Sequence, residues 1–136
     1  MYWTDSTSRK IFVFDYDRAE GNHSNRQLFY ATPDGGSTPD GMSVDREGNI
    51  WSAQWGGFGL HQFSPDGELI EKLPLPVGAV TSCIFGGDNL DELYVTTAGG
   101  QARRGKKVEL STPDGTLYRV KMPVQGQLRF RSRIGL

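Results

Sequence analysis

The sequence contains a single cysteine, Cys83, and only two histidines among its 136 residues. One thiol cannot close a disulfide within the chain or supply a multi-cysteine zinc site. Two histidines leave little material for a histidine-based metal cluster or a catalytic triad. No apolar run approaches the roughly 18 residues of a membrane-spanning helix, and no basic segment followed by an apolar one opens the chain. These absences predict a cytoplasmic protein with no signal peptide and no membrane partner.

Helical periodicity is also nearly absent, whereas turn residues are plentiful, with 18 Gly and 7 Pro. Short strand-like runs recur instead, separated by Gly, Pro, Asp and Asn. They predict strands at residues 1–4, 11–15, 27–31, 42–45, 49–54, 59–63, 68–74, 81–85, 92–97 and 116–122, with a weak last candidate at 128–130. Turn pairs such as Asp66-Gly67 indicate antiparallel hairpins, in which Gly48, Asn49 and Gly67 can accept a positive φ.

An internal repeat groups these strands into units. Residues 2–5 and 11–15 align with residues 51–54 and 60–64 at an offset of 49, and residues 94–96 repeat the pattern 43 positions later. Units of this length, each with about four short antiparallel strands, are typical of β-propeller blades. The sequence therefore predicts an all-β, partial β-propeller of about three blades of four-stranded antiparallel sheets. A β-sandwich ranks second.

The three units differ in their strand count. The middle unit has four strands, the last has three and a doubtful fourth, and the first has three because its innermost strand is missing. We interpret residues 1–122 as the partial propeller and residues 123–136 as a C-terminal tail that could add an edge strand. Since an open set of blades exposes strand edges and apolar surface, we expect the chain to self-associate or to pair with an N-terminal half.

Charge is distributed unevenly. Residues 1–100 hold 6 basic and 14 acidic residues, whereas residues 101–136 hold 9 basic and 2 acidic ones. We interpret the basic part as a solvated tail that folds back on an acidic body. The alternative is a nucleic-acid or anionic-surface binder, which would use residues 103–107 (Arg103, Arg104, Lys106 and Lys107) and 129–133. No recognition helix or aromatic-basic RNA signature supports it, so we expect no nucleic-acid partner.

Several longer motifs follow one another along the chain: "MYWTDSTSRKIFVFDYD", "NRQLFY", "PDGMSVDREGNIWSAQWGGFGLHQFSPDG", "LPLPVGAVTSCIFGGDNLDELYVTTA" and "GTLYRVKM". Over residues 1–122 they resemble the C-terminal half of the senescence-marker-protein (regucalcin), gluconolactonase and luciferin-regenerating family. The resemblance implies a six-bladed propeller that uses one divalent metal to hydrolyse a small-molecule sugar lactone. The alternative is a non-catalytic truncated propeller or scaffold, or a calcium-binding protein of the same family.

The resemblance also implies a metal site built from oxygen ligands. In the family these are a Glu from the first blade, an Asn just before the "YWTDS" segment and an Asp from the Pro-Asp-Gly that opens the next inner strand. Only the Asp has a counterpart in these 136 residues, at Asp40. Such ligands suit Ca²⁺ best, with Mg²⁺, Mn²⁺ and Zn²⁺ as alternatives. Asp40 is thus predicted to be both a metal ligand and the catalytic base that takes a proton from water.

Pro-Asp-Gly occurs four times, with its carboxylates at Asp34, Asp40, Asp66 and Asp114. The simplest interpretation of the tripeptide is a turn, and we adopt it for three of them. Asp40 differs because it directly precedes the apolar segment of a predicted inner strand. The inner strand of a blade lines the channel, so a carboxylate at its end can meet ligands from neighbouring blades.

Two residues are weaker candidates for substrate contact: Ser82, on a predicted channel-lining strand, and Trp55, beside two glycines. We expect a small buried thiol at Cys83 and a packing or surface role for His61. All three tryptophans, Trp3, Trp51 and Trp55, are interpreted first as aromatics within or between blades, and an edge of the pocket is the alternative for Trp55.

Overall fold

Three antiparallel sheets make up the computed structural model, which describes residues 1–99 and 115–128. The first sheet contains β1 (Tyr2–Asp5), β2 (Lys10–Tyr16) and β3 (His23–Ala31). The second contains β4 (Thr38–Val44), β5 (Ile50–Trp55), β6 (Gly59–Phe63) and β7 (Leu69–Pro74), and the third contains β8 (Val80–Gly86), β9 (Glu92–Thr97) and β10 (Tyr118–Lys121). In each sheet, strands that follow one another in sequence are paired neighbours. The described residues contain no helix that could cross a membrane.

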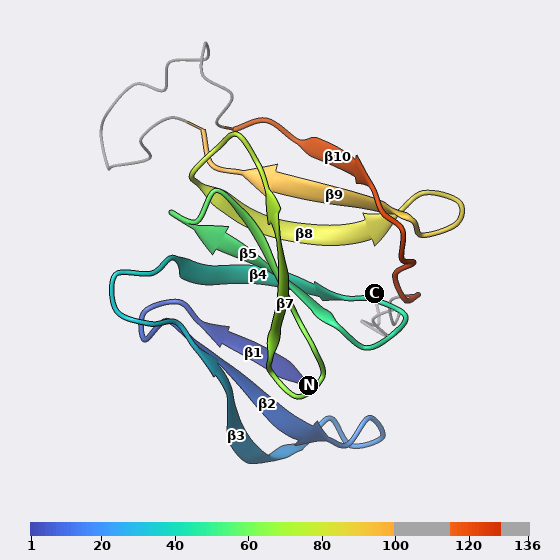
Figure 1. Ribbon diagram of the computed structural model, residues 1–136. Helices are drawn as coiled ribbons and strands as arrows, with labels where there is room; N and C mark the ends of the chain where they lie inside the picture. The colour runs from blue at the N-terminus through green and yellow to red at the C-terminus, as the bar shows by residue number, and fades with distance from the viewer. Residues whose placement is uncertain (100–114, 129–136) are drawn as a thin grey trace, which may run out of the picture.

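The sheets follow one another as separate layers, with the second sheet between the other two (Figure 1). An apolar cluster joins the second and third sheets and includes Trp51, Leu60, Val80 and Leu93. A smaller cluster of Ile11, Ile50 and Phe63, with partly buried residues around it, joins the first and second sheets. The second sheet therefore has both faces covered, and every residue of β6 is buried.

The repeat in the sequence corresponds to equivalent strands. The segments at an offset of 49 become β1 and β2 in the first sheet and β5 and β6 in the second. The second and third sheets each begin with an additional strand, β4 or β8, and these two strands lie against each other. The described residues include no such strand in the first sheet, where β1 is at the edge. The predicted difference in strand count is confirmed for the first sheet.

Some expected boundaries are wrong. β4 begins at Thr38 rather than Met42, because Thr38 and Pro39 already pair with the end of β5 before the register shifts between Pro39 and Met42. Asp40 consequently lies inside the strand, at this irregularity, and not ahead of it. β3 begins four residues earlier than expected, at His23.

Turn geometry is partly as expected. Gly48 and Gly67 have a positive φ, of 91° and 88°. The expectation for Asn49 was wrong: its φ is not positive, and it supports the turn through its side chain and backbone N–H, which both donate to Asp45. Leu128 lies outside any strand, and the rest of the weak candidate at 128–130 lies outside the described residues, as do Asp114 and residues 103–107.

A buried carboxylate, Asp45, holds the turn between β4 and β5. It is completely buried and accepts hydrogen bonds from the backbone N–H groups of Glu47 and Asn49 at 3.0 and 2.9 Å. The Asn49 amide and the Trp51 indole N–H also donate to it, at 3.1 and 3.0 Å. The Asp45 carbonyl accepts from Gln127 at 2.7 Å, so the same turn anchors the segment after β10.

Candidate functional site

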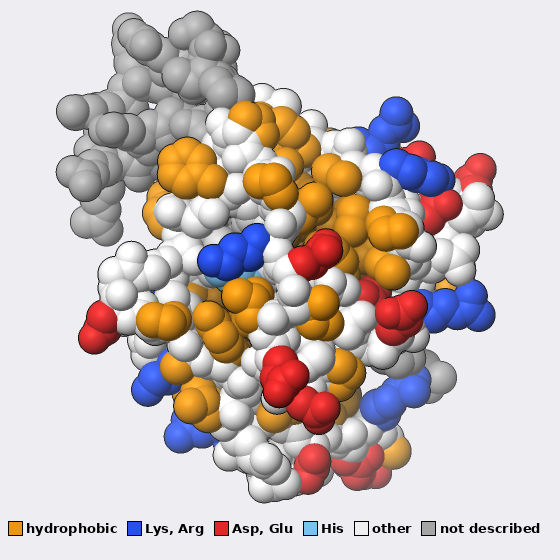
Figure 2. Space-filling model, in the orientation of Figure 1, with side chains coloured by type: hydrophobic (Ala, Val, Ile, Leu, Met, Phe, Trp, Pro, Cys, Tyr) orange, Lys and Arg blue, Asp and Glu red, His pale blue; other side chains and the backbone are white. Residues whose placement is uncertain are grey.

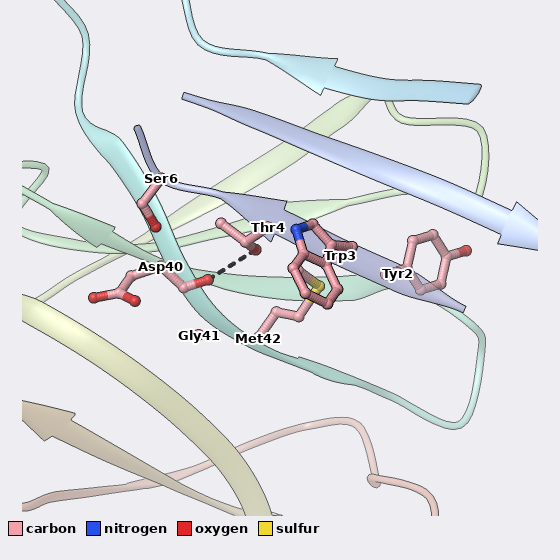
Figure 3. Close-up of a pocket in the computed structure, with 7 residues that line it drawn as sticks. All are labelled: Tyr2, Trp3, Thr4, Ser6, Asp40, Gly41 and Met42. Carbon is pink, nitrogen blue, oxygen red and sulfur yellow. Dashed lines mark hydrogen bonds between the residues drawn. The ribbon is translucent and has the colours of Figure 1, made fainter. Parts of the chain in front are cut away.

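An open pocket of about 330 Å³ lies where β1 passes over β4 (Figure 3). Its lining residues come from two segments: Tyr2, Trp3, Thr4 and Ser6 from β1 and the turn after it, and Asp40, Gly41 and Met42 from β4. Asp40 is the only charged residue among them. The sequence had singled out Asp40, and the structure places it in a concave site with hydroxyl and aromatic side chains.

Asp40 is partly shielded from water. Burial raises the pKa of its carboxyl above the ordinary value, and the hydrogen bond from the Gly41 backbone N–H offsets part of this effect. Among the residues that the structure describes, no Lys or Arg forms an ion pair with it. A carboxylate with a raised pKa and no cationic partner is a better proton acceptor than an exposed aspartate.

Two hydroxyl groups from the β1 segment hold β4 in place beside the pocket. Thr4 Oγ1 donates a hydrogen bond to the Asp40 carbonyl at 3.0 Å, and Ser6 Oγ donates to the Pro39 carbonyl at 2.9 Å. Figure 3 shows the Asp40 carboxylate directed away from the Trp3 and Met42 side chains. These two bonds hold β4 where its register with β5 shifts, between Pro39 and Met42, and so fix the backbone that carries Asp40.

The opposite side of β4 is packed tightly against β8. A Cβ atom on Gly41 would overlap the Ser82 hydroxyl, lie 2.6 Å from Ser82 Cβ and lie 2.9 Å from the Thr81 carbonyl oxygen. Ser82 is therefore next to the backbone of the residue that follows Asp40, although it does not line the pocket. The glycine of this Pro-Asp-Gly is required by close strand approach, not by a turn conformation.

We expect Gly41→Ala to destabilise the protein by about 1–3 kcal/mol, because the added methyl group forces β4 away from β8. Urea denaturation followed by circular dichroism measures this change. The double variant Gly41→Ala/Ser82→Gly, which removes the opposing side chain, should recover part of the loss. A single variant as stable as the wild type would contradict the tight contact.

The other candidate residues lie outside the pocket. Trp55 ends β5, is 42% exposed and forms an isolated bridge with Ala79, so the structure does not bring it to Asp40. Cys83 is buried, as expected, and its thiol donates to the Trp51 carbonyl. His61 is also buried and packs edge-on against Phe63, and burial together with nearby Lys72 lowers its pKa. Both Cys83 and His61 have packing roles.

Trp3 differs from its expected role. Trp51 is buried in the core between sheets, whereas Trp3 is 59% exposed and lines the pocket. The residue that aligns with Trp51 at the offset of 49 is Tyr2, and Trp3 aligns with Ser52. Trp3 is on β1, which is at the edge of its sheet.

Sequence reasoning also missed Thr4 and Ser6. Thr4 is in β1 and Ser6 is in the turn after it, and no signal in the sequence would have placed either residue beside Asp40.

The donor atoms near Asp40 decide whether a divalent cation fits. Ca²⁺ takes six to eight oxygen ligands and Mg²⁺ six, usually including more than one carboxylate or several waters. In residues 1–99 and 115–128 no group of three or more His, Cys, Asp or Glu side chains could hold a metal. Thr4 and Ser6 already donate to backbone carbonyls. The described residues thus contribute one anionic ligand and do not form a metal cage by themselves.

Comparison with known proteins agrees with the sheets and the pocket. The family model described as "SMP-30/Gluconolactonase/LRE-like region" matches residues 1–99. The pentonolactonase XacC of Haloferax volcanii is 40% identical over 140 residues, covering 100% of this chain and 48% of that protein. A solved luciferin-regenerating enzyme is 34% identical with a TM-score of 0.78, over 93% of this chain and 43% of the other. A solved regucalcin of Agrobacterium tumefaciens, titled a calcium-binding protein, has the same TM-score and coverage at 22% identity.

The fold is therefore that of a partial, propeller-type all-β protein, as the sequence predicted. The chain belongs to the SMP-30/gluconolactonase/LRE-like family. It spans less than half the length of the curated relatives that it matches, between 33% and 48%.

Proposed function

We propose that this chain provides the Asp40-bearing part of a sugar lactone hydrolase whose activity depends on a divalent cation. The observation that carries the proposal is the position of Asp40: the residue lines an open pocket from the inner strand β4, and burial raises the pKa of its carboxyl. The Haloferax volcanii relative is named a pentonolactonase, and a solved structure 31% identical to this chain is titled a gluconolactonase. Both names support a sugar lactone as the substrate class.

In the proposed reaction, the Asp40 carboxylate accepts a proton from a water molecule while the water oxygen bonds to the lactone carbonyl carbon. The ring C–O bond then breaks, and the departing alkoxide takes up the proton, which yields the open-chain hydroxy acid. Thr4 and Ser6 contribute by holding the β4 backbone, so that Asp40 keeps its position against the substrate. Trp3 offers an apolar ring face that a sugar can contact.

Asp40 is also proposed to be one oxygen ligand of the cation, with the remaining ligands coming from outside the described residues. Calcium is our first choice, with Mg²⁺, Mn²⁺ and Zn²⁺ as alternatives, since carboxylate and water oxygens suit these ions. When bound, the cation would polarise the lactone carbonyl. A cytoplasmic location and direct substrate contact by Ser82 or Trp55 belong to the same proposal.

The test is hydrolysis of gluconolactone and a pentonolactone by the purified full chain, followed by acid release, with and without each cation. We expect hydrolysis that rises with added cation and is lost in Asp40→Asn. Asp66→Asn is the matched control, because Asp66 occupies the same tripeptide in an exposed turn. If the wild-type chain hydrolyses the lactones no faster than Asp40→Asn does, the enzymatic function of this chain is rejected and a non-catalytic scaffold is favoured.

A further inference from the structure

Gln54, on β5, is a completely buried polar side chain that the proposed reaction does not use. Side chains alternate along a strand, so Gln54 shares one face of β5 with Ile50 and Ser52. Ile50 belongs to the apolar cluster that joins the first and second sheets. A buried amide costs folding free energy unless both its oxygen and its nitrogen have hydrogen-bond partners. The partners of Gln54 therefore indicate what this residue holds in place.

Two serines satisfy the Gln54 amide. Its Oε1 accepts a hydrogen bond from the Ser37 hydroxyl at 2.8 Å, and its Nε2 donates to the Ser52 hydroxyl at 3.1 Å. Ser52 is on the same strand as Gln54, whereas Ser37 lies immediately before β4. The amide thus ties the segment that enters β4 to the interior of the second sheet.

The tied segment leads directly to Asp40. Pro39 is fully buried and pairs with Gln54 in the register of β4 and β5. The next pair along β4 is Met42 with Ser52, and the register shifts between these two pairs. Asp40 lies within this shift, where regular strand pairing does not by itself fix the backbone. The position of Asp40 therefore depends on how the residues just before it are held.

Gly57, in the turn between β5 and β6, closes the arrangement. A Cβ atom on Gly57 would lie 2.6 Å from Gln54 Cβ and 2.7 Å from Ser37 Cβ. The Gly57 backbone N–H also donates to the Gln54 carbonyl at 3.0 Å. Because the turn packs this closely on both side chains, it keeps the Gln54 amide and the Ser37 hydroxyl together.

We propose that Gln54 is a positioning residue for Asp40: through its hydrogen bond to Ser37 it fixes the start of β4 and, with it, the place of Asp40 in the pocket wall. Thr4 and Ser6 hold the same stretch of β4 from the first sheet. Gln54 acts through this backbone and does not touch the substrate. The inference rests on the proposed function of Asp40, so its test reads the carboxyl itself as well as lactone hydrolysis.

Two variants remove the tie from its two ends. Gln54→Met keeps the approximate size of the side chain and removes the amide, and Ser37→Ala removes the donor at a partly buried position. Gln62→Met is the matched control, because Gln62 is another buried glutamine of the second sheet and donates to Asp45, at the other end of β4, at 3.5 Å. The Asp40 carboxyl of each full chain is titrated by NMR of its carboxyl carbon, and Tm is measured alongside.

We expect Gln54→Met and Ser37→Ala to move the pKa of the Asp40 carboxyl down toward its ordinary value, because a loosened β4 admits water to it. The double variant should move it no further than either single one, since both remove the same hydrogen bond. Gln62→Met should lower Tm and leave the titration unchanged. A titration unchanged in both tie variants, or an equal shift in Gln62→Met, would overturn the positioning role.

In the hydrolysis assay, we expect kcat to fall roughly tenfold in both tie variants while KM stays within about threefold of wild type, because a displaced base slows proton transfer more than binding. Ser37→Thr, which keeps the hydroxyl, should retain the wild-type titration and kcat. An active chain whose kcat is unchanged in the tie variants would also overturn the proposal. A wild-type chain that hydrolyses no lactone would reject the proposed function, and the Asp40 titration would still decide the role of Gln54.

Discussion

Asp40→Asn is expected to lower cation-stimulated lactone hydrolysis by roughly 100-fold or more, because the amide cannot accept the proton from water. The exchange keeps the size of the side chain and leaves intact the backbone carbonyl that accepts from Thr4. The loss should therefore fall on the rate of hydrolysis. Comparison of kcat and KM for wild type, Asp40→Asn and Asp66→Asn measures it. An Asp40→Asn variant within threefold of wild type, on the order of experimental scatter, would remove Asp40 from the reaction.

The same variant has a distinct effect on stability. Burial raises the pKa of the Asp40 carboxyl in the folded chain, so ionising it at neutral pH costs folding free energy. Below the ordinary pKa of an unfolded aspartate both states are protonated, and this cost is absent. We therefore expect Asp40→Asn to raise Tm or leave it unchanged at pH 7 and to give no gain at about pH 3. A fall in Tm at pH 7 would instead assign Asp40 a structural role.

Asp45→Ala is expected to destabilise the protein by about 3–5 kcal/mol, a large share of the 5–15 kcal/mol that a typical domain has. The change leaves the buried Trp51 indole N–H without its acceptor and leaves the Asn49 amide only a long hydrogen bond of 3.4 Å to Glu47. It also frees the turn to which Gln127 is anchored. Urea denaturation, with the slope compared between variants, measures the change in the free energy of unfolding.

Two controls sharpen the test of Asp45. Asp45→Asn keeps one acceptor oxygen and should fall between wild type and Asp45→Ala. Asp88→Ala alters an exposed aspartate in the turn between β8 and β9, and it should stay within about 0.5 kcal/mol of wild type. If Asp45→Ala is equally mild, the hydrogen bonds around this carboxylate contribute little to stability.

Exposed apolar side chains remain on the outer strand β7, where Leu69 and Ile70 are 41% and 52% exposed. Figure 2 shows hydrophobic and charged side chains interspersed over the face that β7 crosses in Figure 1. Scattered exposure of this kind is ordinary for a protein surface.

The strand pattern and the repeat could be predicted from sequence because both depend on local chemistry. The apolar, β-branched and aromatic run Ile11–Phe14 and the turn residues around Gly48 and Gly67 do not need distant partners. The start of β4 could not be predicted in this way. The tripeptide Pro39-Asp40-Gly41 signals a turn, and Thr38 and Pro39 are extended because they pair with the end of β5.

The candidate site, too, could be predicted only in part from the sequence. The sequence by itself determined that the chain is all-β and repetitive and that one Pro-Asp-Gly, at Asp40, stands at an inner strand. Only the tertiary structure decided which residues share a pocket with that carboxyl, because Tyr2 to Ser6 reach it across more than thirty residues of sequence. It also decided that Trp51 is buried in the core, whereas Tyr2, which aligns with it at the offset of 49, is only partly buried and lines the pocket. These equivalent residues differ because β5 lies between two strands, whereas β1 has a paired neighbour on one side alone.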